Sequence, residues 1–192
     1  MQREYDNSGR AERAAETAAR ILKAAEDLIR ETPLAELTLN AVAERSDVSV
    51  QTVIRKFGGW EGLLQAVAQS VRARVQTQRT SVDAGDVEGA VDNVLEHYEA
   101  EGELILRLLS QEAKSPFAAQ AAGEGRAFHR RWVETVFGPH LGGGDRERQV
   151  DALVVATDLY TWRLLRRDLG RELRDVRAVM LRLVRSSLGE RA

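Results

Sequence analysis

The segment TLNAVAERSDVSVQTVIRKF, residues 38–57, decides how this chain folds and what it binds. It contains two short stretches with helical spacing, separated by a break at residues 46–47. Val42 and Ala43 face inward in the first stretch and Val53 in the second, which leaves a polar and basic face exposed. A helix, a tight turn and a second helix with such a face are typical of a helix-turn-helix that enters the major groove of DNA.

Hydroxyl residues stand where each of these two helices begins. Thr38 precedes the first helix and Ser49 the second, and each hydroxyl can accept a hydrogen bond from a first-turn N–H. In the break, Asp47 tolerates the left-handed conformation that such a turn needs. The predicted DNA contacts are Thr38, Ser49, Val50, Gln51, Thr52, Arg55 and Lys56. Gln51 can pair with adenine and Arg55 with guanine.

The overall charge does not supply DNA affinity. The net charge is −2. Residues 1–79 carry 12 Lys and Arg against 11 Asp and Glu, and residues 80–192 carry 16 against 19. Binding must therefore depend on where the cations lie. An N-terminal arm containing Arg3, Arg10 and Arg13 could supply further cations for contacts with DNA. The arginines of such arms are, however, more often solvated than bound to DNA.

Composition excludes several other classes of site and location. The chain has no cysteine, so it forms no disulfide and no thiolate metal site. No apolar run approaches the roughly 20 residues needed to cross a bilayer, and the polar N-terminus lacks a signal-peptide core. We therefore expect a cytoplasmic protein without membrane contact. His129 and His140 lack partners at metal-ligand spacing, and no catalytic set is present, so we expect no enzyme activity, metal or cofactor.

Helical spacing extends through almost the whole chain, so the sequence predicts an all-α fold. An irregular, mobile arm precedes the first helix, and residues 145–169 form one long helix capped by Asp145. The helix at 60–79 is too long for a three-helix head alone and connects to a second domain. Besides the two helices of residues 38–57, we predict helices at residues 14–30, 60–79, 87–100, 103–111, 116–137, 145–169 and 171–188.

The second half contains a more varied set of aromatic and polar side chains than is usual for a simple helical bundle. We predict that some of these side chains line an apolar ligand pocket with a few polar anchors. For any single residue, packing in the core or at a dimer interface is the stronger alternative. The candidate ligand-binding residues are Tyr98, Leu104, Leu108, Phe128, Trp132 and Trp162.

With these residues in view, the head resembles the tetracycline-repressor-type (TetR) family of bacterial transcription regulators. RILKAAEDLIRE, beginning at Arg20, and LTLNAVAERSDVSVQTVIRKFGGWEGLLQAV, ending at Val67, carry the resemblance. The tail DLYTWRLLRRDLG…LVRSSL is similar to the two C-terminal helices of that family. Three residues depart from the family pattern, with Ile54 in place of Tyr, Trp60 in place of Lys and Asp47 in place of Gly.

The resemblance implies a DNA-binding domain at residues 1–79 and an effector-binding and dimerisation domain at 80–192. It further implies a homodimer built from the last two helices, a palindromic operator on double-stranded DNA, and a small effector that releases the DNA. The aromatic candidates predict a mostly apolar effector for a repressor of this kind. Two alternatives stay open: a helical binding protein whose head has lost DNA affinity, and an enzyme on a helical bundle.

Overall fold

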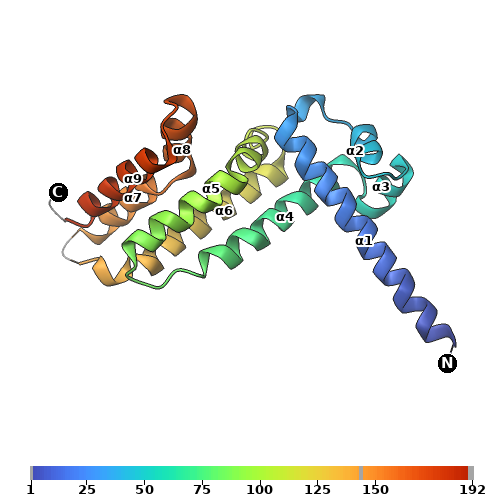
Figure 1. The fold of residues 1–192 in the computed structure, drawn as a ribbon, viewed down its shortest axis with the longest axis horizontal. Helices are drawn as coiled ribbons and strands as arrows, with labels where there is room; N and C mark the ends of the chain where they lie inside the picture. Colours follow the sequence, from blue (N-terminus) through green and yellow to red (C-terminus); the bar gives the residue numbers. More distant parts are fainter. Residues whose placement is uncertain (1, 143–144, 190–192) are drawn as a thin grey trace. The chain divides into compact units, whose positions relative to one another are not determined.

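The computed structural model describes residues 2–142 and 145–189, and no strand occurs in these two ranges (Figure 1). The all-α prediction is confirmed. The chain divides into two compact units, Met1–Val71 and Arg72–Ala192. This division falls inside the predicted connecting helix, whereas the sequence places the domain boundary at the end of that helix.

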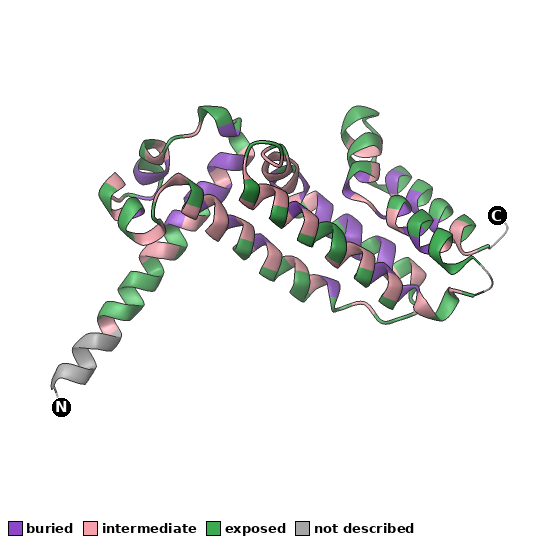
Figure 2. Cartoon of the chain, turned by 180° about the vertical axis from the view of Figure 1, so that it is seen from behind, coloured by how far each residue is buried: buried purple, intermediate pink, exposed green. Residues whose placement is uncertain are grey.

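The N-terminal unit holds the predicted helix-turn-helix. Its elements are α1 (Gln2–Glu31), a 3-10 turn (Leu34–Glu36), α2 (Leu39–Arg45), α3 (Val50–Phe57) and the first part of α4 (Trp60–Arg79). Ile21 and Ile29 of α1, Val42 of α2, Val53 of α3 and Leu63 of α4 are fully buried. Figure 2 shows the ribbon coloured by the burial of each residue. The inward orientation predicted for Val42 and Val53 is thus confirmed.

The first helix is longer than its apolar pattern predicts. It begins at Gln2, whereas the sequence predicts a helix over residues 14–30 and an irregular arm before it. Residues 10–20 are mostly exposed, so burial does not hold this part of the helix. Its RAERAAETAAR sequence is rich in Ala, Glu and Arg, which have high intrinsic helix propensity. Propensity therefore extends the helix beyond its apolar stripe.

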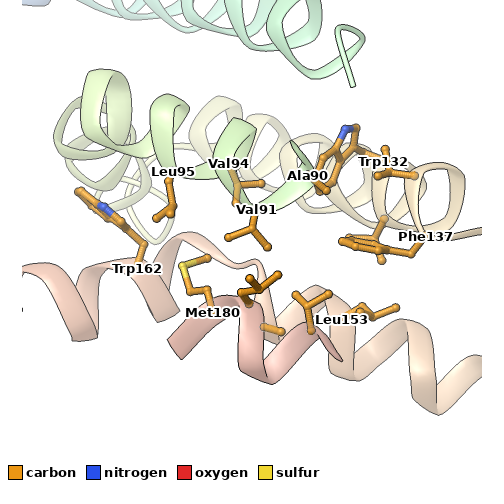
Figure 3. Packing of buried hydrophobic residues seen from close by; sticks show 14 of the residues in the cluster. Ala90, Val91, Val94, Leu95, Trp132, Phe137, Leu153, Trp162 and Met180 are labelled. Carbon is orange, nitrogen blue, oxygen red and sulfur yellow. The ribbon is translucent and has the colours of Figure 1, made fainter. Parts of the chain in front are cut away.

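The C-terminal unit is a helical bundle in which α5 is central. Its elements are the end of α4, α5 (Val87–Leu109), α6 (Pro116–Val136), a 3-10 turn (Gly138–His140), α7 (Arg146–Ala156), α8 (Leu159–Arg163), a π-helical turn (Leu164–Asp168) and α9 (Leu173–Ser187). Helix α5 contacts α6, α8 and α9, and α7 packs against α6 and α9. Trp162 lies at one end of the core cluster, and Trp132 and Phe137 lie at the other (Figure 3).

Helix α5 is continuous where the sequence predicts a break between residues 100 and 103. Gly102 lies within it, and a Cβ there would come within 2.7 Å of the Trp162 ring. The absence of a side chain at Gly102 lets α8 approach α5 closely. Trp162 is 0% exposed, and its indole N–H donates to Glu99 at 2.8 Å.

The predicted long helix at residues 145–169 is broken at Thr157 and Asp158. Thr157 Oγ1 donates to the Leu153 carbonyl, and Asp158 caps α8 by accepting from the Tyr160 N–H. Such side-chain bonds to nearby backbone compete with the helical ladder. The predicted cap at Asp145 is wrong, because its carboxylate bonds Arg148 and accepts no first-turn N–H.

A search of the described helices finds none that is both long and apolar enough to span a membrane.

Replacing Gly102 with alanine should destabilise the protein despite the better helix propensity of alanine. The added Cβ overlaps the buried Trp162 ring, and overpacking a core typically costs about 1–3 kcal/mol. Urea unfolding followed by circular dichroism measures this. Gly125→Ala is the matched control, since nothing lies within 4 Å of a Cβ there, and it should stabilise by up to about 1 kcal/mol. Equal effects of the two substitutions would contradict the packing role of Gly102.

Candidate nucleic-acid interface and C-terminal binding site

The turn between α2 and α3 has the conformation that its sequence predicts. Ser46 is buried, and its Oγ donates to the Val42 carbonyl at 2.6 Å. Asp47 has a φ of 52°, which is the left-handed conformation. The Val48 N–H then donates to the Ala43 carbonyl at 3.0 Å. These bonds close the turn and set the direction in which α3 leaves it.

Both predicted N-caps are present. Thr38 Oγ1 accepts from the Ala41 N–H at 3.2 Å, and Ser49 Oγ accepts from the Thr52 N–H at the same distance. The Ser49 and Thr52 hydroxyls also bond each other at 2.9 Å. The hydroxyls of Ser49 and Thr52 are therefore already engaged in holding the first turn of α3.

Gln51 and Arg55 are the free polar side chains on the predicted reading face. Both are exposed, and neither makes a side-chain hydrogen bond or ion pair within the described part of the chain. Val50 is half-buried beside them. Ile54 is 41% exposed on the same helix and brings an apolar side chain to this face. The groups best placed to contact base edges are thus Gln51 and Arg55.

Other cations of the head are engaged within the protein. Lys56 is half-buried, and its Nζ donates to the Ala14 carbonyl of α1 at 2.6 Å, so it does not extend freely outward as the sequence predicts. Arg45 bonds both carboxylate oxygens of Glu31, and this lowers the pKa of Glu31. The Arg3 side chain lies outside the described residues. The cations open to a phosphate backbone are accordingly fewer than the sequence count suggests.

The end of α3 depends on glycine. Gly58 is the C-cap of α3 with a φ of 77°, a left-handed conformation that glycine adopts without strain. Gly62 lies in the first turn of α4, where a Cβ would overlap the Phe57 carbonyl oxygen. The close approach of α4 to Phe57 fixes the C-terminal end of α3. Trp60, which opens α4, is half-buried.

In the C-terminal unit, two of the six predicted ligand residues meet around a buried cation. The guanidinium carbon of Arg79 lies 4.4 Å from the Trp132 ring centroid and 5.5 Å from that of Tyr98. The Trp132 indole N–H donates to the Arg79 carbonyl at 3.0 Å. Tyr98 Oη donates to the Thr157 carbonyl at 2.8 Å. This group, with His97 and His129, is called the Arg79 cluster below.

The other four predicted ligand residues are placed differently. Trp162 packs against Tyr98 and Gly102 as a fully buried core residue. Leu104 is also fully buried, and Leu108 and Phe128 are half-buried.

The sequence reasoning missed Arg79, although a signal for it exists. Val67, Val71, Val75 and Arg79 follow one another at four-residue intervals, so the arginine continues the inward face of α4.

The histidines of the Arg79 cluster are held neutral. Burial, reinforced by the charge of Arg79, lowers the pKa of His97 to about 3. Burial likewise lowers the pKa of His129 to about 4. His129 Nε2 bonds Thr157 Oγ1 at 3.1 Å, and its ring stacks on Trp132. At neutral pH the cluster thus contains one cation and two uncharged imidazoles.

A set of large apolar side chains is exposed on the last elements of the chain. Helix α7 packs against α9, and α8 contacts α9, so these residues come from neighbouring elements. We call them the α7–α9 apolar face: Val155, Tyr160, Leu164, Leu169, Leu173, Val179 and Leu183. Tyr160, an aromatic residue of the second half, belongs to this exposed face. Exposed apolar surface of this kind marks interaction sites.

Comparisons with known proteins agree with the head geometry. Residues 21–67 match the family model for bacterial regulatory proteins of the tetR family. No curated protein matches the chain. Among solved structures, a transcriptional regulator from Rhodococcus is similar, with a TM-score of 0.76 and 16% identity over 91% of this chain and 98% of that one.

Two further solved structures resemble the chain over most of its length. A TetR transcription regulator from Haloarcula marismortui has a TM-score of 0.68 and 18% identity over 90% of this chain and 98% of that one. A TetR-family transcriptional regulator from Streptomyces coelicolor has a TM-score of 0.59 and 25% identity, over 92% and 97%. The likeness thus extends through both units.

The neutral histidines predict a loss of stability in acid. A folded pKa below the unfolded value means that the unfolded chain binds more protons below about pH 6.5. The contribution of neutral His97 is therefore present above that pH and is lost as the pH falls. At pH 5 the loss is about 2 kcal/mol for His97, from 1.4 kcal/mol per pH unit.

The measurement is urea unfolding of the wild type and His97→Gln at pH 7 and pH 5, followed by tryptophan fluorescence. Trp132 and Trp162 are buried in the same unit as His97, so the signal reports on it. The stability difference between the two proteins should change by about 2 kcal/mol between these pH values. A difference that stays constant would rule out a neutral buried His97.

Proposed function

We propose that this chain, a member of the tetR family of bacterial regulatory proteins, binds operator DNA through α3 and releases it when a small effector binds the C-terminal unit. It acts as a homodimeric repressor on a palindromic operator in the cytoplasm. The domain that contacts DNA is residues 1–79, and residues 80–192 bind the effector and form the dimer.

The observation that carries this proposal is the exposed edge of α3. Its start is held by the Ser49 cap and its end by the Gly58 cap, so the helix presents a fixed face. Gln51 and Arg55 stand free on that face. Each can form two hydrogen bonds with a single base edge, Gln51 with adenine and Arg55 with guanine. A face with two such groups suits sequence-specific reading of the major groove.

The balance of cations favours specificity over tight nonspecific binding. Lys56 and Arg45 are already bonded inside the head, so fewer cations of the head are free to contact DNA phosphates. Because each phosphate contact steepens the dependence of affinity on salt, the head should show a shallow salt slope. A gel-shift experiment with the DNA that flanks the gene, at two salt concentrations, measures both affinity and slope. Absence of any specific shift would favour a helical binding protein without DNA affinity.

Gln51→Ala should change sequence preference. Loss of a bidentate contact removes about 1–3 kcal/mol of discrimination at one base pair of each half-site, while other positions keep theirs. The measurement is binding to a set of operators with single base changes. Gln69→Ala, an exposed glutamine on α4, is the control and should leave the preference unaltered. Equal weakening on every operator by Gln51→Ala would refute a base-reading role.

The proposed dimer uses the α7–α9 apolar face. Burying a leucine at an interface stabilises the dimer by about 1.5–3 kcal/mol. A charged side chain placed at the same position would have to be buried unpaired, so it should separate the subunits. Leu183→Glu, at a site 42% exposed, should give a monomer in light scattering at micromolar concentration. Ile54→Glu makes the same exchange at a site 41% exposed in the head and should stay dimeric. A dimeric Leu183→Glu would place the interface elsewhere.

A further inference from the structure

Among the described residues of the C-terminal unit, Arg79 is the most buried cation, and its hydrogen bonding is incomplete. The residue is 3% exposed at the last position of α4. Its Nη2 donates to Tyr98 Oη at 3.3 Å. Its Nη1 is buried and meets no acceptor in the described part of the chain. One face of the guanidinium group is thus covered by aromatic rings, while one of its nitrogens has no partner.

No carboxylate among residues 2–142 and 145–189 forms an ion pair with this guanidinium group. A buried charge is strongly unfavourable unless an opposite charge pairs with it, and arginine does not escape by losing its proton. The Trp132 face and the C-terminal end of α4 attract a cation, but neither replaces a carboxylate. Tyr98, the titratable group that bonds Arg79, stays neutral because burial raises the pKa of its hydroxyl, and the other titratable groups of the cluster, His97 and His129, are bases.

Other arginines of the same unit are provided with carboxylates. Arg166 bonds Glu99, Arg177 bonds Asp92 and Glu88, and all of these are far more exposed than Arg79. The chain therefore supplies counter-charges where water already screens the cation, and supplies none where the need is greatest. This contrast indicates that the counter-charge of Arg79 comes from outside the chain.

Groups suited to a ligand lie in the same cluster as the unpaired nitrogen. The Tyr98 and Trp132 rings lie against the guanidinium group. Thr157 and the neutral His129 ring, which bond each other at 3.1 Å, bring further polar atoms to the cluster. The combination of an unpaired cation, flat apolar surface and uncharged polar groups matches an amphipathic anion.

We propose that the effector carries a carboxylate, which pairs with Nη1 of Arg79 while the apolar part of the molecule contacts Tyr98 and Trp132. This inference rests on the proposed ligand-responsive function and adds an anionic group to the mostly apolar effector that the sequence predicts. The planar guanidinium fork matches a carboxylate in shape and charge. Arg79 ends the same helix that Trp60 opens in the head, so ligand contact at Arg79 acts directly on α4.

The test is thermal unfolding of the full-length protein with sodium benzoate or sodium octanoate, compared with benzamide or octanamide at matched sodium chloride. At least one carboxylate should raise Tm by about 2 °C or more beyond its amide, with a rise that grows with concentration. No excess of either carboxylate over its amide would overturn the inference.

Two variants separate a binding role of Arg79 from a structural one. Arg79→Met removes an unpaired buried charge, so without ligand its Tm should equal or exceed that of the wild type, and the carboxylate response should vanish. Arg79→Lys keeps the charge without the fork and should retain a smaller response. Arg148→Met, at a side chain 85% exposed, should respond like the wild type. A carboxylate response of wild-type size in Arg79→Met would overturn the inference.

Gel shifts with the same four compounds distinguish this inference from the proposed function. Specific DNA binding without any carboxylate effect on Tm leaves the DNA-binding proposal standing and removes the anion site. If the protein shows a carboxylate response that requires Arg79 but no specific DNA binding, the anion site is supported and the proposed DNA-binding function is contradicted. Release of DNA by the stabilising carboxylate alone supports both.

Discussion

Arg79, through its backbone carbonyl and its guanidinium group, links four helices of the C-terminal unit. Its own carbonyl accepts from Trp132 of α6, its side chain stacks on Trp132 and on Tyr98 of α5, and Tyr98 reaches the Thr157 carbonyl at the end of α7. A charge at this depth restricts what can surround it, because any carboxylate would neutralise it and any purely apolar wall would leave it unsolvated. The neutral state of both neighbouring histidines follows from the same charge and the same burial. The polar interior of this unit is therefore arranged around one cation.

The head is organised by a different constraint, the closure of short helices by local hydrogen bonds. Thr38, Ser49 and Gly58 close three of the helix ends, and Asp47 makes the turn between them. Since α2 and α3 are too short to be stable alone, these caps and the buried Val42 and Val53 hold them in place. What remains free on α3 are the Gln51 and Arg55 side chains, which we propose read base edges. Lys56 and Arg45 are bonded to α1, so fewer cations of the head stay open to a phosphate backbone.

The helix-turn-helix could be predicted closely because its signals are local. Caps, the break at Ser46 and Asp47, and the alternation of buried and exposed positions all operate within a few residues. The less accurate predictions concern features that depend on distant residues. The helices predicted at residues 87–100 and 103–111 are one helix, in which Gly102 lies against Trp162. Thr157, where the predicted helix at 145–169 breaks, also bonds the distant His129 and Tyr98. Two residues predicted to bind ligand, Tyr98 and Trp132, lie beside the Arg79 guanidinium group, a residue that the sequence reasoning did not include.

The sequence by itself determined the all-α class, the position of the helix-turn-helix and the exposure of Gln51 and Arg55 on its second helix. It could do so because helical periodicity and capping are short-range properties of the chain. Only the tertiary structure decided which cations are free, which aromatic residues are core, and that Arg79 is buried without a carboxylate. These depend on the approach of helices far apart in the sequence, since the state of a charged side chain is set by everything packed around it and not by its neighbours along the chain.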